Sequence, residues 1–212
     1  VYSQAKRYYA EIMMPFRKII KKNLDKLAPY DIALIAPSHG PLYRRPSFIL
    51  DAYQDWVASP PKNAVALPYV SMHDSTKLMV DYFVAALVER GMGVEQFNLE
   101  QPDPGKLAMG LVDPATIVIG TPTVLAGPHP NAAYAAFLAN ALRPKARFAS
   151  VIGSYGWGGK TVEQLAALMG NLKPELLPPV LVKGLPTKAD YAGLDGLADT
   201  IAEKHANLGP EE

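Results

Sequence analysis

Short apolar runs alternate with helical patterns along most of this 212-residue chain, and this alternation is what most limits its possible folds. The runs lack the period-two pattern of half-exposed strands, so we expect strands that are covered on both faces. Repeated strand–helix units predict an α/β fold, a doubly wound five-stranded parallel sheet with helices on both faces. The expected strands are residues 64–70, 94–99, 116–120, 148–153 and 180–183, and the expected helices are 76–89, 105–111, 131–142, 161–168 and 188–205.

The first 58 residues follow a different pattern. Apolar residues at helical spacing predict a helix from Tyr9 to Leu27, which Pro15 starts or kinks because it removes an amide donor. Residues 31–36 predict a buried strand and residues 48–57 a second helix, and this helix–strand–helix unit is small for a core of its own. We therefore expect a piece of a longer protein. Its parts are the remnant of another domain (1–58), a linker (59–62), the α/β domain (63–208) and a tail (209–212).

Composition excludes several classes of protein. The 21 basic and 20 acidic residues give a net charge of +1, so no whole-chain attraction to nucleic acid or to an acidic membrane is expected. The absence of cysteine excludes disulfides, thiolate metal sites and a cysteine nucleophile. No apolar run approaches the ~20 residues that span a bilayer, and no signal-peptide pattern opens the chain. We expect a cytoplasmic protein.

The loop after the first strand is a candidate phosphate site. In doubly wound sheets, ligands bind at the carboxyl ends of the strands, near the point where the strand order reverses. This first site loop carries three hydroxyl groups and leads into a helix, where free backbone amides suit a phosphate. An ordinary helix cap rich in serine and threonine has the same composition, so both interpretations stay open. The loop consists of Ser71, Met72, His73, Asp74, Ser75 and Thr76.

Two further loops follow the third and fourth expected strands. The second site loop (121–130) is framed by prolines and has apolar residues that suit a flat ring, although a plain connection would look similar. The third site loop (153–160) combines glycines, which let a backbone approach a ligand, with an aromatic stacking face. A glycine-rich turn around a buried tryptophan is its alternative. The candidate ligand contacts are Thr121, Pro122, Thr123, Val124, Leu125, Ala126 and Gly127, with Ser154, Tyr155, Gly156, Trp157, Gly158 and Gly159.

Together the three loops resemble the FMN site of the flavodoxin fold, and more closely that of the flavodiiron proteins (A-type flavoproteins). Ser71, Met72 and Thr76 match a Ser-Met-x-x-x-Thr motif of that family. Residues 120–123 match its Gly/Thr-Pro-Thr pattern, and residues 154–159 match Ser-Tyr-Gly-Trp-Gly-Gly. The resemblance implies a flavodoxin-like domain that binds FMN through the three loops.

The resemblance extends upstream and also has gaps. Residues 8–16 and 37–41 are similar to the end of the family's metallo-β-lactamase-like domain, in which His39 matches the last iron-ligating histidine. The family's His-x-Glu-x-Asp-His motif is missing, and one ligand cannot hold two irons. A diiron centre is thus implied only for an intact parent, and a fortuitous turn histidine is the alternative. Two further positions depart from the family. Many relatives have glycine or another small or neutral residue in place of Asp74, and an asparagine often stands in place of Leu125.

In function, the resemblance implies the FMN-binding electron-transfer domain of a flavodiiron oxygen or nitric oxide reductase, an oxidoreductase. It further implies a head-to-tail homodimer and an electron donor that is a rubredoxin-like protein, a reduced flavin or a deazaflavin carrier. A free-standing flavodoxin shuttle and a flavodoxin-like module without flavin are the alternatives. The upstream residues favour the reductase, because a shuttle has no use for half of another domain.

Overall fold

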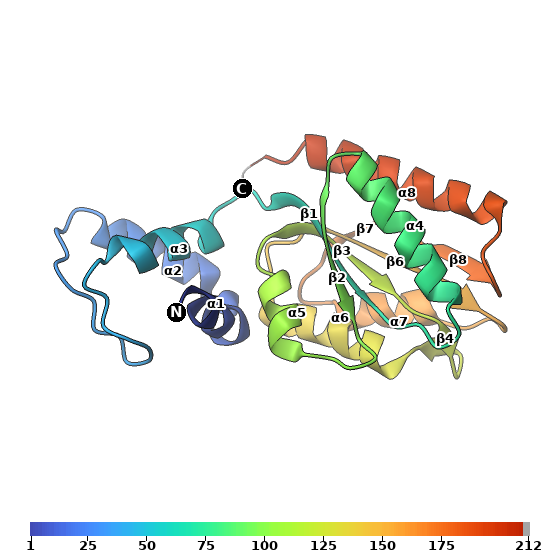
Figure 1. Cartoon of the computed structure of the whole chain (residues 1–212), viewed down its shortest axis with the longest axis horizontal. Coiled ribbons are helices and arrows are strands. Elements are labelled where there is room, and N and C mark those ends of the chain that lie inside the picture. The colour runs from blue at the N-terminus through green and yellow to red at the C-terminus, as the bar shows by residue number, and fades with distance from the viewer. Residues whose placement is uncertain (210–212) are drawn as a thin grey trace.

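The computed structural model describes residues 1–209, in which a helical N-terminal segment lies beside an α/β domain (Figure 1). Pro15 lies in the short 3-10 turn that separates two helices of this segment. Proline lacks the N–H of a regular helix, so the predicted kink is present there. The helix nevertheless begins earlier than predicted, at Tyr2. The elements are α1 (Tyr2–Tyr8), the π-helical η1 (Tyr9–Met13), the 3-10 η2 (Met14–Phe16), α2 (Arg17–Leu27) and α3 (Ser47–Val57).

The buried strand predicted at residues 31–36 is wrong. Only Ile35 pairs, in an isolated bridge with Tyr43, and Leu34 is 49% exposed. A strand needs a neighbour for its backbone groups, and the bridge to Tyr43 is the only pairing that this run makes within residues 1–209. Its apolar side chains instead line a groove of about 1040 Å³, together with Tyr8 and Tyr53.

The predicted parallel sheet is present. Its strand order, β2-β1-β3-β6-β8, is that of flavodoxin-like doubly wound folds. The chain order reverses at β1, which pairs with β2 on one side and with β3 on the other. The strands of this sheet are β1 (Lys62–Tyr69), β2 (Gly93–Asn98), β3 (Pro114–Gly120), β6 (Phe148–Tyr155), β7 (Glu175–Leu176) and β8 (Val180–Lys183), and β4 (Thr123–Val124) and β5 (Gly127–Pro128) form a separate hairpin.

Within residues 1–209, the sheet contains six strands rather than the predicted five. β7 pairs with the start of β6 and β8 pairs with its end, both on the edge opposite β3. They therefore form one edge strand with an interruption at residues 177–179. Pro178 and Pro179 lie in this interruption and lack the N–H that a ladder requires. A strand of two residues is too short to show a hydrophobic pattern in the sequence, which explains why β7 was not predicted.

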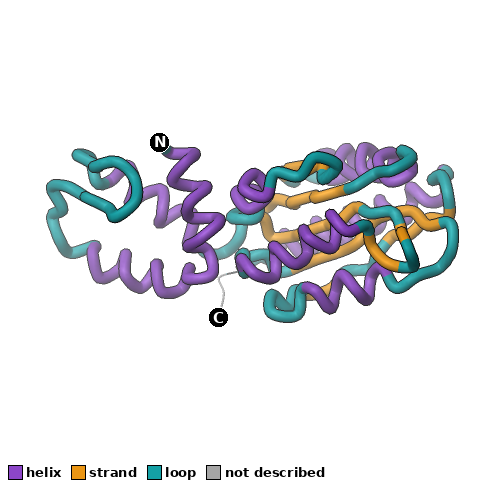
Figure 2. Tube along the Cα trace, turned by 90° about the horizontal axis from the view of Figure 1, so that it is seen from below, coloured by secondary structure: helices purple, strands orange, loops and turns teal. Residues whose placement is uncertain are grey.

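Helices cover both faces of the sheet, as predicted (Figures 1 and 2). Val65 and Leu67 of β1 belong to the core under α4 and α8, whereas Ala66 between them belongs to the core on the other face. Burial on both faces is the reason that the strands read as continuous apolar runs. One face carries α4 (Ser75–Glu89) and α8 (Lys188–Ala206), and the other carries α5 (Pro104–Gly110), α6 (Pro130–Leu142) and α7 (Thr161–Leu168).

The N-terminal segment is joined to the α/β domain by packing and by charge. Tyr9 and Trp56 are fully buried in the same core as residues of α5, α6 and α7. Asp113, before β3, lies 3.1 Å from the Lys6 ammonium of α1 and 3.4 Å from that of the buried Lys145. Burial raises the pKa of Asp113, but the attraction of these lysines outweighs it and holds the pKa below its usual range. The carboxylate is therefore ionised and ties the two parts together.

The C-terminal end of the described chain returns to the sheet. The backbone oxygen of Gly209 accepts a hydrogen bond of 2.5 Å from the Arg147 guanidinium, just before β6. The expected tail otherwise lies outside the described residues, since it comprises residues 209–212. Within residues 1–209, no helix combines the length and the apolar character that crossing a membrane requires.

Candidate functional site

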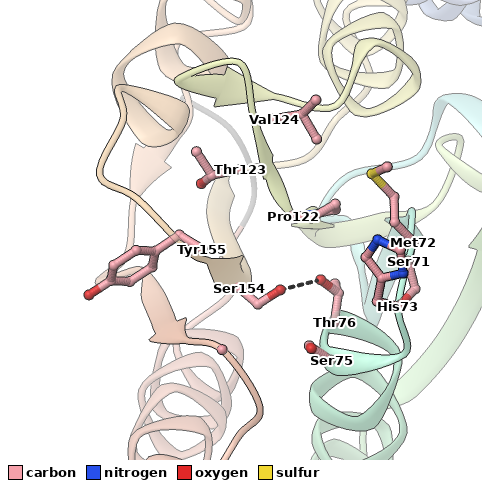
Figure 3. A pocket seen from close by; sticks show the side chains of 12 residues that line it. Ser71, Met72, His73, Ser75, Thr76, Pro122, Thr123, Val124, Ser154 and Tyr155 are labelled. Carbon is pink, nitrogen blue, oxygen red and sulfur yellow. Dashed lines mark hydrogen bonds between the residues drawn. The ribbon is translucent and has the colours of Figure 1, made fainter.

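The three site loops meet around one cavity of about 340 Å³ (Figure 3). The cavity lies at the carboxyl ends of β1, β3 and β6, next to the point where the strand order reverses, which is where ligands of doubly wound folds bind. No carboxylate, ammonium or guanidinium group occurs among the described residues that line it. They are Ser71, Met72, His73, Ser75, Thr76, Pro122, Thr123, Val124, Ser154, Tyr155, Gly156 and Gly184.

The first site loop lies beside the cavity and leads into α4. The Ser71 hydroxyl accepts a hydrogen bond of 3.1 Å from the Lys77 amide and so caps α4. Within residues 1–209, the amides of Met72 and His73 make no hydrogen bond to protein. Asp74 takes the left-handed conformation (φ 59°), which aspartate tolerates better than most residues, and it is exposed and does not line the cavity. Free amides at the start of a 15-residue helix favour an anion.

A buried pair of hydroxyl groups connects the first loop to the end of β6. The Thr76 and Ser154 hydroxyl oxygens lie 3.2 Å apart, and the two residues are 1% and 8% exposed (Figure 3). Each hydroxyl group can donate one hydrogen bond and accept two, so the pair retains capacity for a ligand. This contact connects α4, which follows β1 in the chain, to β6, although β3 lies between β1 and β6 in the sheet.

The second site loop folds into the β4–β5 hairpin, which sequence patterns did not predict. The buried Thr121 stabilises its start, because the Thr121 hydroxyl donates to the Pro122 carbonyl (2.9 Å) and accepts from the His129 amide (3.0 Å). Thr123 and Val124 line the cavity, whereas Leu125 at the tip is 100% exposed. Only the first half of this loop thus reaches the cavity.

The third site loop lines the cavity with its first residues alone. Tyr155 and Gly156 are part of the lining, but Trp157 is 92% exposed and does not contribute. Gly159 faces the second loop instead, where a Cβ atom would lie 2.7 Å from the Ala126 carbonyl oxygen. The alternative of a glycine-rich turn around a buried tryptophan is therefore excluded.

The structure brings most predicted contact residues to the cavity, leaves some outside it and adds one. Gly184, after β8, was not predicted; it adopts φ 75°, and its amide donates to the Tyr155 carbonyl (2.9 Å). A lone glycine after an apolar run is a weak signal, which explains the omission. The predicted residues that do not line the cavity are Asp74, Thr121, Leu125, Ala126, Gly127, Trp157, Gly158 and Gly159.

His39 lies in the connection between α2 and α3 and lines the apolar groove of the N-terminal segment, not this cavity. The N-terminal segment and β4 lie at opposite ends of the molecule (Figure 1). His39 is exposed, and its ring centroid lies 5.7 Å from that of Tyr8. Among residues 1–209, no group of three or more His, Cys, Asp or Glu side chains has an arrangement that holds a metal ion.

Sequence and structure comparisons agree on one family. No protein-family model matches the sequence. The nitric oxide reductase of Moorella thermoacetica is 31% identical over 212 residues, covering 98% of this chain and 53% of its own length. The solved rubredoxin oxygen:oxidoreductase of Desulfovibrio gigas superposes with a TM-score of 0.87 at 28% identity, over 95% of this chain and 52% of that one. The chain belongs to the flavodiiron protein family.

Similarity to this family includes the N-terminal segment. The flavodiiron protein of Giardia intestinalis has the same fold over 94% of this chain and 52% of its own, with a TM-score of 0.76 at 19% identity. The chain spans about half the length of the curated relatives that it matches. Flavodiiron similarity therefore extends well beyond the sheet domain and the three site loops.

Proposed function

We propose that this chain is the FMN-binding electron-transfer part of a flavodiiron oxygen or nitric oxide reductase, and that its intact parent is the oxidoreductase. One observation carries the proposal: three loops distant in sequence line one cavity at the carboxyl ends of β1, β3 and β6. The relatives named nitric oxide reductase and rubredoxin-oxygen oxidoreductase support the same reaction class.

The residues of the first loop fit the phosphate group of FMN. The amides of Met72 and His73 are free to donate, and the hydroxyl groups of Ser71, Ser75 and Thr76 surround the same end of the cavity. Hydrogen bonds from amides and hydroxyls to an ionised phosphate are stronger than those between neutral groups. These groups, rather than a lysine or arginine, would hold the phosphate.

The second and third loops fit the ring of a flavin. Pro122, Val124 and Tyr155 give that side of the cavity an apolar lining. FMN, when bound, supplies the electron-transfer chemistry, and the protein supplies binding, orientation and electrostatic surroundings. Residues 121–130 and 153–160 contain no aspartate or glutamate, so this side of the site does not repel the negative charge that accompanies reduction.

The residues of this chain do not fit a diiron centre. His39 is the one residue of this sequence that matches an iron ligand of the family, and one ligand cannot hold two irons. We propose residues 1–58 as the end of a metallo-β-lactamase-like domain, 59–62 as a linker and 63–208 as the flavodoxin-like domain. The apolar groove beside Tyr8 and Tyr53 supports a further domain against the N-terminal segment.

We further propose the partners of the intact parent. The relatives' names point to a rubredoxin-type electron donor, while a reduced flavin or deazaflavin carrier is the other candidate. A head-to-tail homodimer in the cytoplasm completes this proposal. The exposed Leu125 and Trp157 beside the cavity support a protein contact at this end of the molecule.

A free-standing flavodoxin shuttle has less support. The similarity to the Moorella relative covers 98% of this chain, including the helices before the linker, which a flavodoxin-like sheet does not require. A flavodoxin-like module without flavin would retain the fold but has no need of free amides and hydroxyls around one cavity.

Titration of the flavin-free protein with FMN, followed by flavin fluorescence, tests the proposal. We expect binding at a ratio of one to one. Thr76→Val removes one hydroxyl from the phosphate end and is expected to weaken binding by roughly 1.5 to 3 kcal/mol, the value of a hydrogen bond to a charged group. Thr200→Val is a matched control, because within residues 1–209 the Thr200 hydroxyl bonds only the Gly196 carbonyl of its own helix. Absence of FMN binding by the wild type would refute the proposal.

A further inference from the structure

The tip of the second site loop has an unusual backbone for its residue types. Leu125 and Ala126, the two residues between β4 and β5, have φ values of 50° and 62°. Two-residue hairpin turns with positive φ at both positions strongly favour Asn-Gly, because side chains with a Cβ are strained there. The Leu125 side chain is fully exposed, so no packing compensates for the strain. Another part of the protein must hold this turn.

The segment that begins α7 contacts the hairpin at several points. The Lys160 amide donates to the Ala126 carbonyl at 2.8 Å. The hydroxyl oxygens of Thr123 and Thr161 lie 2.8 Å apart. Gly127 leaves room for the amide group of Gln164, which a Cβ atom would displace. These contacts connect the second site loop to the end of the third site loop and to the start of α7.

Thr161 takes part in this connection without lining the cavity. It is 2% exposed, and Thr123 is the only hydrogen-bond partner of its hydroxyl group within residues 1–209. Thr123 and Val124 do line the cavity. The Thr161 hydroxyl is therefore linked to the cavity lining through Thr123.

We propose that Thr161 is a positioning residue for the flavin site, whose bond to Thr123 holds the strained hairpin so that Thr123 and Val124 face the cavity. The inference rests on the proposed binding of FMN. In this proposal the second site loop depends on its contact with α7 for its position. Loss of the Thr161 hydroxyl therefore loosens Thr123 and Val124, which line the cavity. The expected consequence is weaker and less ordered binding of FMN, although the residues that line the cavity are the same.

Substitution of Thr161 by valine tests this, because valine keeps the shape and removes the hydroxyl. We expect FMN to bind about fivefold more weakly, the equivalent of about 1 kcal/mol for one hydrogen bond. We also expect the visible absorption bands of the bound flavin to broaden, because its surroundings are less uniform. Thr161→Ser, which keeps the hydroxyl, should restore both, and Thr200→Val should change neither.

A second pair of substitutions separates positioning from a general loss of stability. Leu125→Asn with Ala126→Gly supplies the residues that the turn prefers, so the hairpin no longer needs the hydroxyl contact. In the Thr161→Val background this pair should restore most of the affinity. A double-mutant cycle of Thr123→Val and Thr161→Val should show that the second substitution adds little to the first.

The outcomes distinguish this inference from the proposed function. FMN binding by the wild type with unchanged affinity and spectrum in Thr161→Val would overturn the positioning role and leave the function intact. Additive losses in the cycle, or failure of the turn substitutions to restore binding, would also overturn it. No FMN binding by the wild type would remove the proposed function itself.

Discussion

His205 makes the stability of this protein depend on pH in a way that can be calculated. The imidazole is buried at the end of α8, with Nε2 2.7 Å from the Thr116 hydroxyl and Nδ1 2.8 Å from the Asn63 amide oxygen. Burial lowers the pKa of His205 from 6.5 to about 4. The folded state thus favours the neutral ring, whereas the unfolded chain binds a proton below pH 6.5.

The sign and the size follow from these two values. The stability that His205 contributes is fully present above pH 6.5 and is lost as the pH falls, until the ring is protonated in both the folded and the unfolded chain below about pH 4. The full difference is about 3 kcal/mol, at roughly 1.4 kcal/mol for each pKa unit. Between pH 8 and pH 5 the expected loss is about 2 kcal/mol.

Urea unfolding at several pH values between 8 and 5 measures this loss. His205→Gln keeps polar groups near Thr116 and Asn63 but has no titrating ring, so it should lose about 2 kcal/mol less than the wild type over this range. The exposed His39 provides the control, and His39→Gln should follow the wild type. Parallel pH profiles for the wild type and His205→Gln would refute the reasoning.

Four other predictions concern charge, the tryptophan, the histidine and the flavin potential. Asp113→Asn leaves the buried Lys145 without its carboxylate and should lower the free energy of unfolding by about 3 kcal/mol in urea; a loss below about 0.5 kcal/mol, the level of a surface change, would contradict this. Trp157→Ala should leave stability within about 0.5 kcal/mol of the wild type, but weaken FMN binding by about 1 to 3 kcal/mol if the exposed indole stacks on the ring. Equal affinities would exclude stacking. His39→Ala should leave FMN content unchanged, and elemental analysis of this chain should find no stoichiometric iron. A carboxylate about 8 Å from the ring would destabilise the reduced flavin by roughly 2 kcal/mol. Because the second and third site loops contain no carboxylate, FMN should have a higher reduction potential here than in a flavodoxin with acidic loops. A spectroelectrochemical titration that finds an equal or lower reduction potential would count against this.

Much of the fold could be predicted from the sequence because the central strands β1, β3 and β6 are covered on both faces. Covered strands read as apolar runs, and the helices between them have clear ends, so that predicted and observed bounds differ by about one or two residues for most elements. Thr76 and Ser154 were predicted as contacts of one site, because parallel strands bring their carboxyl ends to one edge. Their mutual hydrogen bond could not be predicted, since it depends on the twist of the sheet.

The parts that could not be predicted depend on tertiary contacts. Leu125 and Ala126 both have positive φ values, which their residue types disfavour. The turn is explained by its contacts with Lys160 and Thr161, which lie far away in the sequence. Residues 31–36 are apolar without being a buried strand, because an apolar run does not specify the partner that covers it. The Trp157 side chain was expected against a ligand, but local sequence does not determine which way an indole in a glycine-rich loop points.

The shared core of the N-terminal segment and the α/β domain has a consequence for dissecting this protein into fragments. The proposed boundary lies at residues 59–62, yet the hydrophobic interior crosses it, since Tyr9, Met14 and Trp56 are buried with residues of α5 and α6. A fragment that starts after the linker would expose this apolar surface to water, at a cost of about 25 cal/mol for each Å². The smallest piece suitable for expression therefore includes the helices before the linker, because they cover apolar surface of the flavodoxin-like domain.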